Sequence, residues 1–255
     1  MHYLMIIFYA FIKKWVGLVF TLYILLLILH DPVMILTVVY ITFANLHTIH
    51  YSINILNLGR FDDSISDLTT ALRCNAPPAP ILTTRSRVFI KLNNFSQAVN
   101  DLTEVLQYQP SDCTMRYHRG LLLKIMNKYY EAIEDFSILV SLLQSDHTQP
   151  LYERLSIIYN HRAFCYRKMN NFDKSLQDYS EAIRYTPHNI RAYINRAFIF
   201  MQSNRYTDAI NDFSKVLKID PNNTYAYHNR GVSSDKIGAF DQALSDFSRV
   251  LKYCL

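Results

Sequence analysis

The sequence predicts an all-α fold in which short helices stack as an array of helix-turn-helix repeats, preceded by a hydrophobic N-terminal helical segment. An arginine recurs every 34 residues along most of the chain, most regularly at Arg162, Arg196 and Arg230. Glycine is scarce, at five of 255 residues, and no stretch alternates apolar and polar residues as a half-buried strand would. A fixed period of this length indicates that each repeat is one helical unit stacked on its neighbours.

The last two repeats carry the pattern most fully, as AYINRAFIFMQSNRYTDAINDFSKVLKIDP and AYHNRGVSSDKIGAFDQALSDFSRVLKYCL. With small and aromatic residues at fixed offsets in a 34-residue period, residues 45–255 resemble the tetratricopeptide repeat family. The resemblance implies a right-handed α-solenoid of six repeats, each with a helix A and a helix B. We expect the repeats to span about 45–78, 79–112, 113–155, 156–189, 190–223 and 224–255.

Local signals place the two helices of each repeat. Helix A is expected to begin after a boundary proline, as at Pro110, Pro187 and Pro221. Polar or glycine-containing pairs then mark the turn to helix B. These pairs are Gly59-Arg60, Asn93-Asn94, Asn127-Lys128, Asn170-Asn171, Asn204-Arg205 and Gly238-Ala239. The spacing from Arg119 to Arg162 is 43, and we expect the nine extra residues, within QSDHTQPLYER, to be a tolerated insertion that lengthens the connection.

Residues at two further offsets are expected to form the core, because no helix pair could bury its apolar face alone. Small residues would let paired helices approach closely, and aromatic residues would fill the space between repeats. The small residues are Ala98, Ala132, Ala209 and Ala243, and the aromatic residues are Phe136, Tyr179, Phe213 and Phe247.

An aspartate follows each repeated arginine 16 residues later, which carries the chain from helix A around the turn and onto helix B. A buried guanidinium needs a carboxylate partner, and the planar fork of arginine suits one better than lysine does. We interpret these residues as structural ion pairs, and rank an arginine ladder for acidic ligands below that interpretation. The pairs are Arg85 with Asp101, Arg119 with Asp135, Arg162 with Asp178, Arg196 with Asp212 and Arg230 with Asp246.

The resemblance implies that functional residues lie on the concave face of helix A, where the family holds extended peptides. Asn195 and Asn229 match an asparagine ladder that binds the peptide backbone, whereas His118 and His161 depart from it. An amide carries donors and an acceptor, so it can pair with a peptide bond of any sequence. Basic residues on the same face favour an acidic peptide, although a solvated polar face is the other interpretation. They include Lys124, Arg167, Lys168 and Arg191.

One binding mode of the family clamps the carboxylates of chaperone tails between lysine, asparagine and arginine side chains. If Asn195 is the second asparagine of that clamp, then His161, Asn229 and Tyr225 stand where an asparagine, an arginine and a lysine are required. The clamp is not reproduced, so chaperone-tail binding is a secondary hypothesis.

We therefore expect a non-enzymatic scaffold or adaptor that binds an extended peptide or a partner helix. Three alternatives stay open: a co-chaperone, a subunit of a ciliary or trafficking assembly, and a truncated substrate-recruiting part of a larger enzyme. The sequence holds no glycine-rich phosphate loop, metal-ligand spacing or catalytic constellation, so neither a cofactor nor a metal is expected. A net charge of +5 without aromatic-basic motifs does not indicate a nucleic-acid partner.

The N-terminal segment, residues 1–44, differs in composition from the repeats. Between Tyr3 and Leu46 the only charged residues are Lys13, Lys14 and Asp31, and an uninterrupted apolar run of 15 residues ends at position 29. About 20 residues are needed to cross a bilayer. Two interpretations stay open: a membrane anchor within residues 3–46, and an artefact of gene prediction, because AT-rich non-coding DNA encodes such residues.

The N-terminal lysines and the last repeat lead to expectations about cellular location and self-association. Lys13 and Lys14 would keep the N-terminus on the cytosolic side, and four cysteines without paired spacing indicate reduced thiols. We expect a cytoplasmic protein, with the repeats facing the cytosol if the segment is an anchor. The last repeat lacks the solvating helix usual in the family, so its apolar face is expected to meet a partner or a second copy unless the chain is truncated.

Overall fold

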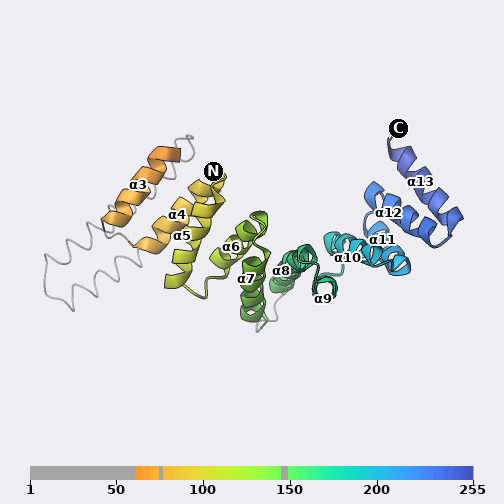
Figure 1. Ribbon diagram of the computed structural model, residues 1–255, viewed down its shortest axis with the longest axis horizontal. Coiled ribbons are helices and arrows are strands. Elements are labelled where there is room, and N and C mark those ends of the chain that lie inside the picture. The colour runs from red at the N-terminus through yellow and green to blue at the C-terminus, as the bar shows by residue number, and fades with distance from the viewer. Residues whose placement is uncertain (1–60, 75–76, 145–148, 255) are drawn as a thin grey trace. The chain divides into compact units, whose positions relative to one another are not determined.

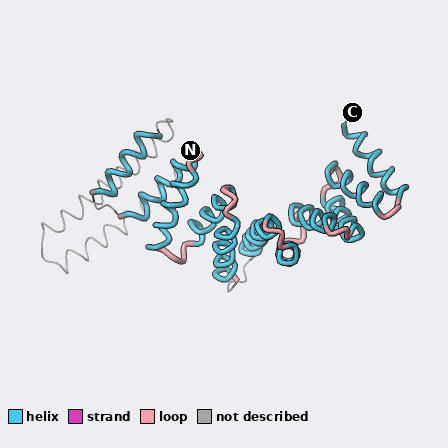
Figure 2. Tube along the Cα trace, in the orientation of Figure 1, coloured by secondary structure: helices cyan, strands magenta, loops and turns pink. Residues whose placement is uncertain are grey.

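The computed structural model describes residues 61–74, 77–144 and 149–254, and within them the chain forms eleven helices joined by turns, with no strand (Figures 1 and 2). The all-α prediction is confirmed for these residues. The chain divides into two compact units, Met1–Tyr108 and Gln109–Leu255. The first contains α3 (Phe61–Arg73), α4 (Pro78–Lys91) and α5 (Phe95–Tyr108).

The second unit contains four pairs of helices, and each helix packs on the next one along the chain. In the repeat scheme α4, α6, α8, α10 and α12 are helices A, and the odd-numbered helices are helices B. The bounds in the second unit are α6 (Cys113–Ile125), α7 (Tyr129–Leu143), α8 (Gln149–Lys168), α9 (Phe172–Tyr185), α10 (Ile190–Gln202), α11 (Tyr206–Ile219), α12 (Thr224–Lys236) and α13 (Phe240–Cys254).

The turn from helix A to helix B has the same backbone conformation in five repeats. Its first residue adopts a positive φ, between 57° and 60° at four asparagines and 78° at Gly238. Asparagine and glycine tolerate this left-handed region better than other residues do. At Asn170 the N–H donates to the carbonyl of Arg167, and the next N–H donates to that of Tyr166, which satisfies carbonyls left open at the end of α8. The predicted breaks therefore coincide with helix ends.

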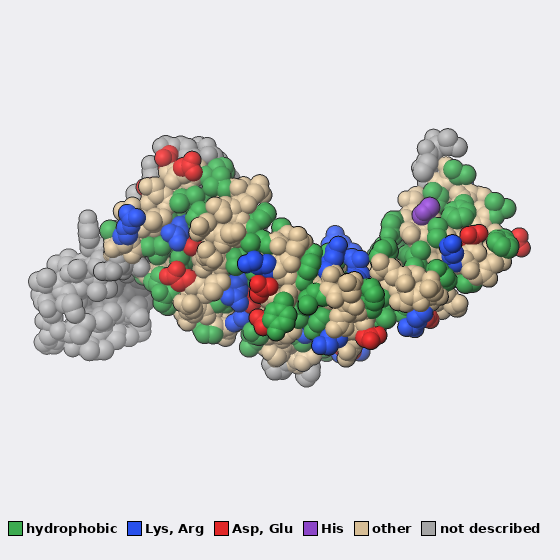
Figure 3. All heavy atoms as spheres, in the orientation of Figure 1, with side chains coloured by type: hydrophobic (Ala, Val, Ile, Leu, Met, Phe, Trp, Pro, Cys, Tyr) green, Lys and Arg blue, Asp and Glu red, His purple; other side chains and the backbone are tan. Residues whose placement is uncertain are grey.

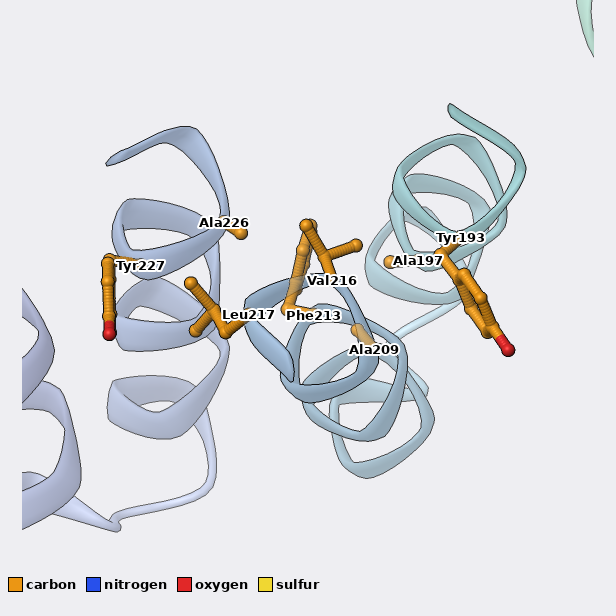
Figure 4. Packing of buried hydrophobic residues seen from close by; sticks show 8 residues of the cluster. All are labelled: Tyr193, Ala197, Ala209, Phe213, Val216, Leu217, Ala226 and Tyr227. Carbon is orange, nitrogen blue, oxygen red and sulfur yellow. The ribbon is translucent and has the colours of Figure 1, made fainter. Parts of the chain in front are cut away.

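Seven of the eight expected small and aromatic residues are buried in the core, and Phe247 is half-buried. Figure 4 shows α11 between α10 and α12, with Ala197 on the side of α10 toward α11 and Leu217 on the side of α11 toward α12, in one buried cluster with Phe213 and Ala209. Phe213 is 1% exposed, and the equivalent aromatic residues of α7 and α9 are fully buried. The side chains of one helix B therefore fill the space between two helices A, which ties neighbouring repeats together.

Each repeated arginine binds the aspartate that lies 16 residues later. The Nε and Nη2 atoms donate to the two carboxylate oxygens at 2.6–2.9 Å, a bidentate geometry that holds both side chains in one orientation. The arginine side chains are 16–20% exposed and the aspartates only 1–6%. The structure thus places all five pairs between a helix A and the following helix B.

The sequence analysis missed a third partner of the arginine. In four repeats the Nη1 atom donates to a hydroxyl on the preceding helix B, two residues beyond the aspartate of that helix. One guanidinium therefore ties its helix A to both neighbouring helices B. The bonds run from Arg85 to Thr69, Arg162 to Ser137, Arg196 to Ser180 and Arg230 to Ser214, at 2.9–3.1 Å.

Asp135 binds a second arginine that the repeat pattern does not predict. Arg116, 8% exposed, donates from Nη1 to Asp135 at 3.2 Å and from Nη2 to the carbonyl of Pro110 at 2.6 Å. It therefore joins the start of α6 to both α7 and the preceding turn.

The nine-residue insertion is not mainly a longer loop, contrary to the expectation. Residues 149–154 belong to α8, which has 20 residues where α6, α10 and α12 have 13. Leu151 and Leu155, four residues apart, are 7% and 1% exposed. Their spacing continues a buried helical face, so packing extends the helix through residues that look like a connection.

The N-terminal segment and the expected helix A of the first repeat lie outside the described residues. Within 61–74, 77–144 and 149–254, no helix is both long and apolar enough to cross a membrane.

We predict that Arg196→Ala lowers the free energy of unfolding by about 3–5 kcal/mol, because it leaves Asp212 buried without its charge partner. Arg205→Ala is the matched control, since the Arg205–Asp208 pair is exposed and such pairs contribute about 0–1 kcal/mol. Urea denaturation followed by circular dichroism measures both. Equal stability of Arg196→Ala and the wild type would refute the structural role of the pair.

Candidate functional site

His161 of α8 lies at the centre of the predicted binding residues, where it contacts both α6 and α7. Its Nδ1 is 3.0 Å from the Lys124 Nζ, and its Nε2 is 3.3 Å from the Tyr117 hydroxyl. The ring stacks on Phe136 with centroids 5.8 Å apart. An ammonium group can only donate, so Nδ1 accepts and we assign the imidazole proton to Nε2, which donates to Tyr117.

The surroundings of His161 keep the ring neutral. Burial, together with the positive charges of Lys124 and Arg191, lowers its pKa from 6.5 to about 4. Burial likewise lowers the pKa of Lys124, and Arg191 adds to that effect. Among the described residues, no carboxylate influences the pKa of either side chain.

Phe164, on the same face of α8, gathers cations around its ring. The Lys124 Nζ lies 5.6 Å from the ring centroid, the Arg167 Cζ 5.1 Å and the Lys168 Nζ 5.7 Å. Arg167 also lies 5.3 Å from the ring centroid of Phe198 on α10. Such distances allow cation–π attraction, which holds the basic groups in place without neutralising them.

These contacts form one continuous surface across three helices A, which we call the cationic strip. It consists of Tyr117 and Lys124 of α6, His161, Phe164, Arg167 and Lys168 of α8, and Arg191 and Phe198 of α10. Figure 3 shows lysine and arginine side chains gathered in the region between α8 and α10. Lys168 and Arg191 are exposed, so the strip is accessible to a ligand.

The asparagines of the predicted ladder make different contacts. The Asn195 Nδ2 donates to the Asn160 Oδ1 at 3.4 Å, which links α10 to α8. The Asn229 Nδ2 donates to the carbonyl of Tyr225 within α12 at 2.8 Å. In the described chain no donor binds the side-chain oxygen of Asn195 or Asn229. His118 is exposed, with its ring centroid 6.0 Å from that of Tyr117.

Of the predicted binding residues, the structure brings together Lys124, His161, Arg167, Lys168 and Arg191, whereas His118, Asn195 and Asn229 lie outside this group. The sequence analysis missed Tyr117, Asn160, Phe164 and Phe198. A signal existed for two of them, since Phe164 and Phe198 follow the repeated arginine by two residues in successive repeats.

The described residues hold no group of three or more histidine, cysteine, aspartate or glutamate side chains that could bind a metal ion. The buried thiol of Cys165 has its pKa raised to about 12 by desolvation, so at neutral pH it is protonated and a poor nucleophile. The side chains of the cationic strip can bind anions and peptide groups.

Comparison with known families identifies the repeat type. The tetratricopeptide repeat model matches residues 156–189 and 190–223, which form α8 to α11 apart from the first turns of α8. These two adjacent units are tetratricopeptide repeats. No curated protein matches the sequence closely enough to be a relative.

Solved structures of tetratricopeptide-repeat proteins share the fold. A tetratricopeptide repeat protein from Parabacteroides merdae superposes with a TM-score of 0.64 at 17% identity, covering 82% of this chain and 79% of that one. MamA superposes with 0.61 at 18% identity, covering 69% and 91%. YrrB, described as having an unusual peptide-binding site, superposes with 0.56 at 17% identity, covering 72% and 91%. At this identity the likeness shows the fold alone.

The lowered pKa of His161 predicts a pH-dependent stability. The unfolded chain binds a proton near pH 6.5, whereas the folded chain binds it only near pH 4. Neutral His161 therefore contributes fully to the free energy of unfolding above pH 6.5. This contribution is lost as the pH falls toward 4, by up to about 3 kcal/mol. His161→Gln should flatten the fall in stability between pH 7 and pH 4, and His188→Gln, at an exposed site, should not. Parallel slopes in all three proteins would contradict the assignment.

Proposed function

We propose that this tetratricopeptide-repeat chain is a non-enzymatic scaffold that binds an acidic peptide, in extended form, along the helix A face of α6, α8, α10 and α12. The observation that carries the proposal is the cationic strip. Basic groups of two helices surround one aromatic ring, and no carboxylate of the described chain influences the pKa of Lys124 or His161.

A site with this composition favours carboxylate ligands for two reasons. Lys124 is partly desolvated, so an incoming carboxylate would meet a cation that water screens weakly. Arg167 is held between two rings and offers a planar fork that suits bidentate binding. Exposed Lys168 and Arg191 would steer an acidic segment toward the strip and form ion pairs with it at the edge of the site.

Asn195 and Asn229 would bind the peptide backbone. The side-chain oxygen of each is open to a donor, and each amide bonds to the protein through one nitrogen that carries a second hydrogen. In an extended peptide the backbone N–H of one residue could therefore donate to the oxygen, while the C=O of the same residue accepts from the nitrogen. This contact is independent of the peptide sequence, whereas the cationic strip would select for charge.

Recognition of acidic chaperone tails is the secondary form of this proposal. The cationic strip supplies carboxylate-binding groups, although not at the clamp positions of the family. A ciliary or trafficking partner, or an enzyme that recruits substrates through these repeats, would use the same face.

We predict that the full-length chain binds fluorescein-labelled 12-residue peptides of alternating glutamate and leucine more tightly than lysine-leucine peptides, measured by fluorescence anisotropy. The double variant Lys168→Glu, Arg191→Glu should weaken the affinity for the acidic peptide roughly tenfold and leave folding intact, because both side chains are exposed charges at the edge of the site.

Asn195→Ala with Asn229→Ala should weaken the affinity for any bound peptide without changing the preference for acidic over basic peptides.

Lys215→Glu is the matched control, since Lys215 is an exposed cation on α11, a helix B. It reverses one charge where the strip variant reverses two, and it should leave affinity within about twofold at 0.15 M salt. Equal affinity for the acidic and basic peptides, or equal losses in the control and strip variants, would count against the proposed face.

We further propose that a second copy of the chain docks on α13. Phe240, Leu244 and Leu251 are 64–69% exposed there, and Figure 3 shows hydrophobic side chains over this helix. The residue equivalent to Leu251 on α11 is Leu217, which is 8% exposed because α12 packs on that face. Leu244 and Leu251 follow Phe240 and Leu244 by four and seven residues, so the three exposed side chains form one helix-pairing seam.

Charge favours an antiparallel pair of α13 helices. The first turn contains Asp241, and the last turns contain Arg249 and Lys252. Antiparallel pairing places the acidic end of one copy beside the basic end of the other, and also opposes the helix dipoles. Such a twofold interface uses the same surface on both copies.

We predict a concentration-dependent dimer of the full-length chain in sedimentation velocity experiments. Leu244→Glu with Leu251→Glu should give a monomer, because each glutamate would place a charge in the seam. Tyr130→Glu, at a 65% exposed position on α7, should still dimerise. A wild-type chain that is monomeric at about 100 μM, some hundredfold above a micromolar dissociation constant, would refute this interface.

A further inference from the structure

A pocket between α6, α7 and α8 lies beside the cationic strip and has a volume of about 260 Å³. Its apolar walls are Leu139 and Leu143 of α7 and Ile157 and Ile158 of α8. Tyr117 belongs to both the pocket and the strip, because it lines the pocket while its hydroxyl is hydrogen-bonded to His161. The pocket and the strip are therefore adjacent parts of one surface in the second unit.

The insertion builds one wall of this pocket. Arg154 lines it from the extra turns of α8, which α6, α10 and α12 lack. Leu151 and Leu155, buried on either side of Arg154 in the sequence, fix those turns against the protein. The nine residues thus give this repeat a hollow with a basic group at its edge.

The size and lining of the pocket restrict what it can hold. Its volume lies below the roughly 300–1,000 Å³ of small-molecule and cofactor sites, so it suits a single side chain. Ile157 is 45% exposed, which leaves apolar surface for that side chain to cover. Arg154 is exposed and forms no ion pair with the described residues. Asp112, one residue before α6, accepts bonds from two N–H groups at the start of that helix.

We infer that this pocket anchors one large apolar side chain of a bound peptide, and that Arg154 binds a carboxylate next to it. This inference rests on the proposed function, because the peptide would continue from the pocket past Tyr117 into the cationic strip. The carboxylate is either the C-terminus of the peptide or an adjacent acidic side chain, since both present the same two oxygens to a guanidinium. Selectivity for an apolar residue beside a carboxylate would add to the general preference for acidic peptides.

Cys113 lines the pocket and provides a handle for testing it without a known ligand. The full-length chain with Cys74→Ser and Cys254→Ser retains Cys113, which is half-buried, and Cys165, which is buried with a raised thiol pKa. The probes are disulfides of N-acetylated Cys-Phe with a free carboxylate, Cys-Phe-amide, Cys-Phe-Asp-amide and Cys-Ala with a free carboxylate. Intact-protein mass spectrometry measures labelling at equilibrium against increasing β-mercaptoethanol.

A probe that has both phenylalanine and a carboxylate should resist about tenfold more β-mercaptoethanol than Cys-Phe-amide or the alanine probe. Retention of Cys-Phe with a free carboxylate supports a C-terminal ligand, and retention of Cys-Phe-Asp-amide supports an internal acidic residue. Arg154→Gln should abolish the preference for carboxylate while keeping that for phenylalanine, and Lys215→Gln should change neither. Equal labelling by all four probes would overturn the inference.

The proposed function and the pocket fail in different ways. If the labelling preferences are absent while binding of the acidic peptides still depends on Lys168 and Arg191, the inference about the pocket is refuted and the proposed function is supported. If the preferences are present but the acidic peptides show no dependence on the strip, the pocket stands as a separate side-chain site.

Discussion

The described structure depends on one guanidinium in each of five repeats. It binds both oxygens of an aspartate on its own helix B and, in four repeats, a hydroxyl on the preceding helix B. These three directions fix the rotation of helix A about its axis as well as its position between neighbours. The apolar core supplies most of the burial, but apolar contacts are non-directional. The arginine therefore sets which face of each helix A points outward.

That constraint explains why binding residues can change from repeat to repeat. Because the arginine fixes the helix, the residue directly before it can keep one orientation while its type and exposure vary. Thr84 is buried there, His161 half-buried and His118 exposed. His161 and Asn195 both directly precede the arginine, yet one is a neutral, half-buried ring beneath a lysine and the other links two helices through its amide. The scaffold is periodic and the surface is not, as expected for an adaptor whose specificity lies in a few repeats.

Periodicity made much of the fold predictable. The helix breaks at the asparagine turns and the positions of the arginine and aspartate pairs followed from offsets that repeat in the sequence. The serine and threonine partners recur with equal regularity but were overlooked, because hydroxyls are common on helix surfaces. The contact of Lys124 with His161 could not be predicted, since it crosses 37 residues and the nine-residue insertion. The helical extension of α8 depended on burial of Leu151 and Leu155, which only packing reveals.

Native-state hydrogen exchange of the Arg196→Ala variant tests the central claim most directly, because it resolves which helices lose protection. If one arginine ties three helices together, amides of α9, α10 and α11 should exchange faster, while those of α6 and α7 keep the wild-type rates. Loss of protection confined to α10, with α9 and α11 unchanged, would contradict this account and would show that apolar packing alone holds the repeats in register.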